Sequence, residues 1–163
     1  IGIEGLGHLA INFYKALGWH VTAFASSQDK NELIKSMGAD EVVSSTDKVT
    51  LKDMGAKFDL LISTVNVSLD WNLFLNTIKP RGRLHFVGAV LEPIKSSVFS
   101  LMTGRRSISG SPVGSPKNIK KMLNFCVQHN IKPIVEHFKF SDINNAIDKV
   151  RSNEVRFRAV LSW

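Results

Sequence analysis

The chain has 163 residues, of which 44% are hydrophobic and 21% are charged, and its formal net charge is +7. This length and balance predict an ordinary globular fold with a buried core and exclude a largely disordered chain. No apolar run is long enough to cross a membrane and the first residues lack a signal-peptide pattern, so we expect a cytoplasmic protein with no membrane partner.

The first residues, Ile1-Gly2-Ile3-Glu4-Gly5-Leu6-Gly7, have the spacing of a turn that joins a strand to a helix. In a Rossmann dinucleotide-binding unit, the glycines of this turn permit a tight bend, close approach of the pyrophosphate, and packing of the helix on the strand. Glu4 stands where the second glycine is expected. A carboxylate about 5 Å from a phosphate would cost about 3 kcal/mol, so we expect the Glu4 side chain to turn away.

The next segments alternate between helical and strand patterns. Apolar residues at helical spacing predict a helix over residues 6–17. A strand over 20–25, a helix over 29–37, a strand over 41–43, a polar stretch over 44–57 and a buried strand over 58–63 follow.

The end of the strand over 20–25 carries the residues that would meet the adenosine ribose. An acidic residue there would accept hydrogen bonds from the 2'-hydroxyl of NAD and would repel a 2'-phosphate. This chain instead has Ser26, with Ser27 beside it and Lys30 one turn later. The pattern therefore favours NADP as the cofactor, with NAD as the weaker alternative.

The remaining segments complete an α/β pattern. A helix over 69–78, a turn at 79–82, a strand over 83–88 and a strand over 107–110 are expected. We therefore predict a Rossmann-type, doubly wound parallel sheet over residues 1–113. Only Ile1 precedes the first glycine, so the first strand is largely missing and we expect a gap, with unpaired backbone, between the strands over 20–25 and 58–63.

Residues 114–163 have a different pattern, which predicts a C-terminal α+β tail. Ser115 followed by Pro116 begins a helix, and Ser141 is expected to cap a second one. Strands are expected over 133–140 and 155–161. The tail carries no nucleotide motif, so we expect it to pack against another domain.

The cysteine and the basic residues indicate little further chemistry. Cys126 is the single cysteine, so it cannot form an internal disulfide, and its helical setting predicts a core thiol. The lysines and arginines are scattered and lack interleaved aromatic residues. We therefore expect no nucleic-acid partner. The five histidines do not have the spacing of a ligand set.

Six motifs in series resemble the C-terminal half of the zinc-dependent medium-chain alcohol dehydrogenases, specifically the cinnamyl-alcohol-dehydrogenase-like branch. The motifs are residues 2–10, 37–40, 59–65, 86–89, 107–111 and 154–158. The resemblance implies hydride transfer between NADP(H) and a primary alcohol or aldehyde, a small-molecule substrate. It also implies a homodimer that pairs the strand over 107–110 along its edge.

The same resemblance implies which residues hold the cofactor. Gly2 to Gly7 would form the pyrophosphate turn, residues 25–30 would hold the ribose and its 2'-phosphate, and Arg158 would reach a cofactor phosphate. The complete set is Gly2, Ile3, Glu4, Gly5, Leu6, Gly7, Ala25, Ser26, Ser27, Lys30, Thr64, Gly88, Ser111, Pro112, Val113 and Arg158. Thr64, Gly88 and Ser111 to Val113 would line the nicotinamide, although Thr64 and Gly88 also fit purely structural roles.

In this family the zinc ligands come from the domain that precedes the nucleotide-binding unit. We therefore expect no catalytic or metal-ligating residue in this chain, an absent N-terminal catalytic domain, and no dehydrogenase activity from the chain alone. One alternative is a non-catalytic remnant that binds a nucleotide or a nucleic acid. Another is a methyltransferase that uses S-adenosylmethionine, which Ser26 disfavours because that cofactor's ribose calls for an acidic residue.

Overall fold

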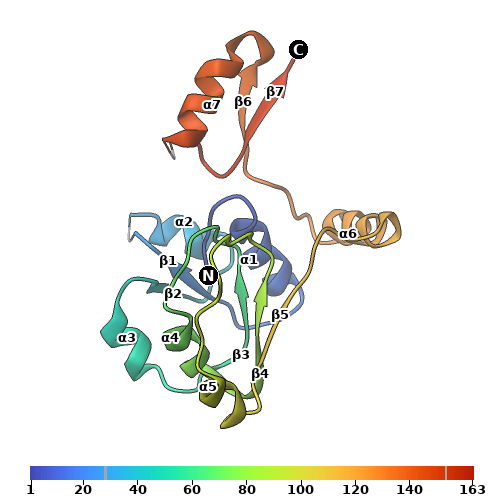
Figure 1. The fold of residues 1–163 in the computed structure, drawn as a ribbon. Helices are drawn as coiled ribbons and strands as arrows, with labels where there is room; N and C mark the ends of the chain where they lie inside the picture. The colour runs from blue at the N-terminus through green and yellow to red at the C-terminus, as the bar shows by residue number, and fades with distance from the viewer. Residues whose placement is uncertain (28, 153) are drawn as a thin grey trace.

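The computed structural model describes residues 1–27, 29–152 and 154–163, and it has the alternating helices and strands of an α/β protein (Figure 1). The elements in chain order are α1 (Gly7–Ala16), β1 (Thr22–Ala25), α2 (Asn31–Ser36), β2 (Glu41–Ser44), α3 (Lys48–Asp53), β3 (Phe58–Ser63), α4 (Trp71–Asn76), β4 (Ile78–Phe86), α5 (Val98–Met102), β5 (Ser107–Gly110), α6 (Pro116–Gln128), β6 (Glu136–Lys139), a 3-10 turn (Phe140–Asp142), α7 (Ile143–Arg151) and β7 (Ala159–Ser162).

The parallel sheet of the Rossmann part is divided in two. β1 pairs with β2, whereas β3, β4 and β5 form a separate sheet in that order. The two parts are connected through Ile1 and Gly2: Ile1 N donates to Ile62 O at 2.6 Å, Thr64 N donates to Ile1 O at 2.9 Å, and Gly2 N donates to Phe24 O at 3.1 Å. The expected gap between the strands over 20–25 and 58–63 is therefore confirmed.

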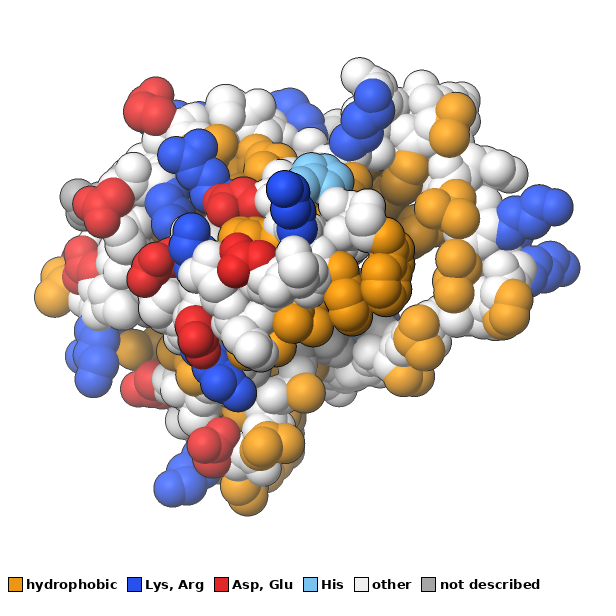
Figure 2. Space-filling model, turned by 90° about the horizontal axis from the view of Figure 1, so that it is seen from above, with side chains coloured by type: hydrophobic (Ala, Val, Ile, Leu, Met, Phe, Trp, Pro, Cys, Tyr) orange, Lys and Arg blue, Asp and Glu red, His pale blue; other side chains and the backbone are white. Residues whose placement is uncertain are grey.

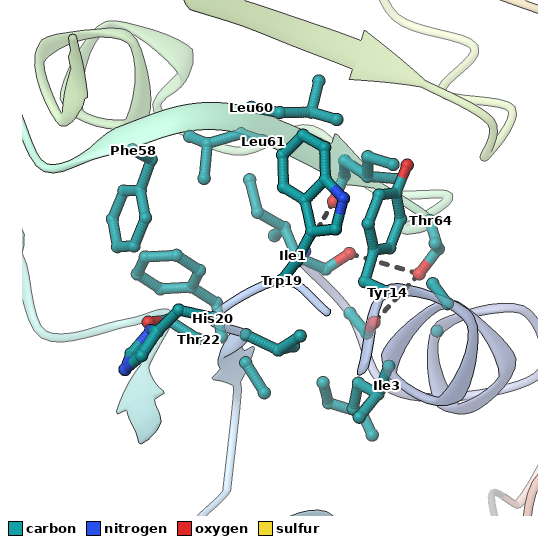
Figure 3. Close-up of a pocket in the computed structure, with 18 residues that line it drawn as sticks. Ile1, Ile3, Tyr14, Trp19, His20, Thr22, Phe58, Leu60, Leu61 and Thr64 are labelled. Atoms are coloured by element: carbon teal, nitrogen blue, oxygen red, sulfur yellow. Dashed lines mark hydrogen bonds between the residues drawn. The ribbon is translucent and has the colours of Figure 1, made fainter. Parts of the chain in front are cut away.

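An apolar slot lies between β1 and β3 where a further strand would fit (Figure 3). β1, β3 and α1 line it. Trp19 and Tyr14 approach it from the end of α1, and their rings lie 5.6 Å apart in an edge-on arrangement. Trp19 remains 46% exposed, so the indole covers the slot only partly.

The core is divided between the two faces of the sheet. Successive residues of a strand point to opposite faces, and in β1 Phe24 packs with α3 and α4 while Ala23 and Ala25 pack with α1 and α2. Trp71 and Phe74, at 1% exposure each, fill the first face. Helices on both faces of a parallel sheet define the doubly wound architecture that the sequence predicts.

Several local predictions differ from the structure. Residues 79–82, expected as a turn before the strand, lie inside β4 as an irregularity in its pairing with β3, with Arg81 at φ +66°. Two short helices, α3 and α5, were not expected. Asp47 caps α3 by accepting hydrogen bonds from Val49 N at 3.0 Å and Thr50 N at 3.1 Å.

The caps of the C-terminal helices differ in outcome. Ser115 caps α6 as predicted and accepts a hydrogen bond from Asn118 N at 3.3 Å. Ser141 does not cap α7, because it lies inside the 3-10 turn and Asp142 occupies the cap position without a side-chain hydrogen bond. Cys126 is partly exposed on α6, so the prediction of a core thiol is wrong.

The C-terminal tail extends away from the Rossmann part and exposes apolar side chains to solvent. β6 and β7 form a separate parallel pair beside α7, above the Rossmann part, while α6 projects to the side (Figure 1). Figure 2 shows hydrophobic side chains gathered over the projecting helix, where Met122, Leu123 and Val127 are 42%, 54% and 83% exposed. Among the described residues, no helix is long and apolar enough to cross a membrane.

Candidate dinucleotide-binding site

The turn before α1 is held by close contacts that only glycine allows. Gly2 has a φ of +84°, and a Cβ there would lie 2.9 Å from Thr64 Oγ1. A Cβ at Gly7 would overlap the carbonyl oxygen of Gly2 and would lie 2.8 Å from its carbonyl carbon. Gly7 N also donates to Glu4 O at 2.6 Å, which closes the turn. The first residues therefore bend back tightly onto the start of the helix.

Gly5 differs from Gly2 and Gly7 because its side faces open space. A Cβ built on Gly5 meets no atom within 4 Å. α1 begins two residues later, at Gly7, and its first turn contains no acidic residue. The first amides of a helix lack partners within the helix and favour an anion. The open side of Gly5 and the start of α1 together can accommodate a phosphate group.

Two other residues of this turn point elsewhere. Ile3 is 6% exposed and packs in the core between the sheet and helices α1 and α2, so only its backbone is available to a ligand. Leu6 occupies the position before α1 and its side chain is largely exposed. Neither side chain adds a polar contact to the turn.

The end of β1 carries the polar residues predicted to bind the ribose. Ala25 is buried and ends the strand, and Ser26 and Ser27 follow on the surface. Lys30 Nζ donates to Glu4 Oε1 at 3.0 Å, which links this loop to the glycine turn. The structure thus brings the two predicted parts of the site together. The Glu4 side chain is exposed and directed to Lys30.

At the opposite end of the site, Thr64 and Gly88 serve the backbone. Thr64 Oγ1 donates to Ile1 O at 3.1 Å and to Gly2 O at 3.0 Å. Gly88 N donates to Ser63 O at 3.1 Å, and a Cβ at Gly88 would lie 2.6 Å from Thr64 O. Both residues hold the ends of β3 and β4 close together, so any contact with a cofactor would come in addition to this role.

Ser111, Pro112 and Val113 follow β5 and are exposed. His85, which the sequence motifs did not indicate, is within hydrogen-bonding distance of Ser111. His85 Nδ1 lies 2.9 Å from Ser109 Oγ, and His85 Nε2 lies 2.9 Å from Ser111 Oγ. The parallel register of β4 and β5 places His85 beside Ser109. The only sequence signal for this cluster would have been the register of two strands that are distant in the chain.

Two residues of the C-terminal tail, Ile134 and Phe157, contact His8 at the start of α1, and Arg158 follows Phe157 in the chain. The His8 ring is fully buried and stacks on Phe157 at 4.5 Å, and its Nε2 accepts a hydrogen bond from Ile134 N at 3.2 Å. Burial lowers the pKa of His8, and the nearby positive charge of Arg158 lowers it further. The C-terminal tail thereby contacts the start of α1, next to the glycine turn in the chain.

The described residues do not form a metal centre. No group of three or more His, Cys, Asp or Glu side chains within the described ranges is arranged to hold a metal ion. The residues present therefore do not fit a zinc site, and we assign no chemical step to a metal on this chain.

Comparison with known proteins identifies the family. Residues 5–128 match the family described as zinc-binding dehydrogenase, and the chain belongs to this family. It is 50% identical over 162 residues to an aldehyde reductase from Synechocystis, a match that covers 99% of this chain and 48% of the relative.

Solved structures agree with this assignment. A cinnamyl alcohol dehydrogenase from Sorghum bicolor matches with a TM-score of 0.92 and 34% identity, over 98% of this chain and 46% of that protein. A cinnamyl alcohol dehydrogenase from Helicobacter pylori in complex with NADP(H) matches with a TM-score of 0.85 and 30% identity, over 98% of this chain and 46% of that one. The chain thus spans about half the length of these relatives.

Proposed function

We propose that this chain is the cofactor-binding half of an NADP-dependent alcohol dehydrogenase or aldehyde reductase. The complete enzyme would transfer a hydride between NADP(H) and a primary alcohol or aldehyde. The observation that carries the proposal is the glycine turn, where the close approach of Gly7 to Gly2 leaves Gly5 open beside the start of α1. A solved relative in complex with NADP(H) supports it.

Most of the predicted residues have a role in this proposal. The backbone of Gly2 to Gly7 would hold the pyrophosphate, and Arg158 would contribute a positive charge from the tail. Ser26, Ser27 and Lys30 would hold the 2'-phosphate of the ribose, because hydroxyls and an ammonium donate to phosphate oxygens. Residues 111–113 would border the nicotinamide.

The chemistry itself would depend on the rest of the protein. Oxidation of an alcohol by a zinc enzyme needs three protein ligands and an open position on the metal for the substrate. We infer that the other half of the enzyme supplies these ligands, and that it also supplies a strand to the slot between β1 and β3. Residues 1–113 would then form the cofactor domain, and residues 114–163 would return to the catalytic domain.

The experiment that tests this function is a titration of the chain with NADPH and, separately, with NADH, followed by nucleotide fluorescence. We expect NADPH to bind more tightly than NADH. A matched assay with a primary alcohol, NADP and zinc should give no turnover by the chain alone. Absence of binding by both dinucleotides would contradict the proposal, and salt-sensitive binding of a nucleic acid in its place would favour the non-catalytic alternative.

A further inference from the structure

The Glu4–Lys30 ion pair joins two segments that the proposed cofactor must enter. Glu4 lies in the glycine turn and Lys30 lies directly before α2, and their charged atoms are 3.0 Å apart. No local helical spacing forces this contact, since the residues are 26 positions apart in the chain. The pair therefore connects the pyrophosphate side of the proposed site to its ribose side.

A second carboxylate lies at the same loop. Ser27 Oγ donates to Asp29 Oδ2 at 2.9 Å, and Asp29 N donates back to Ser27 Oγ at 3.2 Å. Two of the three polar side chains proposed for the 2'-phosphate, Ser27 and Lys30, thus already have a carboxylate as partner. A phosphate group that enters this loop must compete with these carboxylates for the same donors.

The pair with Glu4 is the one that a phosphate can replace readily. The Lys30 and Glu4 side chains are 42% and 60% exposed, and exposed ion pairs stabilise a folded protein only weakly. A phosphate monoester carries nearly two negative charges and offers three strong acceptor oxygens. Lys30 would therefore exchange the single charge of Glu4 for the larger charge of the 2'-phosphate.

We propose that Glu4 is a specificity-determining residue that competes with the cofactor's 2'-phosphate for Lys30 and so reduces the preference of the site for NADP(H) over NAD(H). This inference rests on the proposed function. NAD(H) has a 2'-hydroxyl in place of the phosphate and leaves the Glu4–Lys30 pair closed. Any repulsion between Glu4 and the pyrophosphate acts on both dinucleotides alike, so the ratio of the two affinities isolates the competition for Lys30.

The test compares Glu4→Gln with the parent chain in titrations with NADPH and NADH. Glu4→Gln keeps the size of the side chain and removes its charge. We expect the NADPH affinity to rise about two- to fivefold more than the NADH affinity, the range set by the loss of an exposed ion pair. In a Lys30→Met background the same substitution should change the ratio much less.

Glu32→Gln is the matched control, because Glu32 pairs with Lys35 at 3.6 Å on α2. It removes the same charge nearby and should leave the ratio unchanged. An equal change for NADPH and NADH in Glu4→Gln, or the same change in ratio in the Lys30→Met background, would overturn the inference. Absence of binding by every variant would instead contradict the proposed function.

Discussion

Substitution of the two glycines that flank Leu6 should separate the fold of the turn from its use by a ligand. In Gly7→Ala, the new methyl group would overlap Gly2 O and would lie 2.8 Å from the Gly2 carbonyl carbon and 3.2 Å from Thr64 Oγ1. The obstacles are mainly backbone atoms, which cannot rotate away. In Gly5→Ala, the methyl group meets no atom within 4 Å.

The expected magnitudes follow from these contacts. Overpacking of this kind costs about 3 kcal/mol at the upper end of its usual range, and alanine in a helix recovers about 1 kcal/mol relative to glycine. Gly7→Ala should therefore lower the unfolding free energy by about 2 kcal/mol, and the melting temperature of a chain of this size by about 4 to 8 °C. Gly5→Ala should change the stability by less than about 0.5 kcal/mol.

The assay combines thermal unfolding, followed by circular dichroism, with NADPH titration. Gly5→Ala should weaken NADPH binding by about tenfold although its stability is unchanged, because its methyl group occupies the approach of the pyrophosphate. A Gly7→Ala variant as stable as the parent chain would refute the geometry of the turn. A Gly5→Ala variant that binds NADPH as tightly as the parent chain would refute the proposed position of the pyrophosphate beside Gly5.

Three further predictions concern the ribose loop, the tail and the core. Ser26→Asp should weaken NADPH binding by about tenfold or more and leave NADH binding unchanged, because a carboxylate repels the 2'-phosphate. An NADPH affinity equal to that of the parent chain, measured by the same titration, would contradict this. The pKa of buried His8 is lowered from its usual 6.5 in the folded chain. As the pH falls, the unfolded chain therefore binds a proton at this residue at a higher pH than the folded chain does. Stability should be full above about pH 6.5 and fall as the pH drops below it. His8→Asn, which can still accept from Ile134 N, should flatten the melting temperature between pH 7.5 and 5.5, and an unaltered slope would exclude His8 as the cause. Trp71 is 1% exposed and its ring lies 4.8 Å from that of Phe86, so Trp71→Ala should cost about 3 to 5 kcal/mol in urea unfolding; a loss below 1 kcal/mol would contradict the core described above.

Local sequence signals predicted most of the secondary structure because they act over a few residues. The apolar run at residues 58–63 coincides with β3, and Ser115-Pro116 marks the start of α6. α3 was not predicted because it lies within a polar stretch, residues 44–57, in which the capping residue Asp47 does not stand out. The misplaced turn at 79–82 has the residues of a turn, but its pairing with β3 depends on a partner strand that local patterns do not reveal.

Contacts between distant segments were beyond such reasoning. The glycine spacing indicated the turn itself, but it did not indicate where the exposed Glu4 side chain points. Its partner Lys30, and the hydrogen bonds of His85 with two serines, depend on how separate strand ends meet in space. The attachment of the tail through His8 likewise joins residues 126 positions apart.

The most direct test of the central claim is hydrogen exchange of the chain with and without NADPH, measured by mass spectrometry. If the chain is a dinucleotide-binding half-enzyme, NADPH should slow exchange in residues 2–9 and 25–35 and leave α6 unchanged. Protection confined to α6, which carries Lys117, Lys120 and Lys121, would indicate that the nucleotide binds by charge alone. That result, or no protection anywhere, would contradict the account.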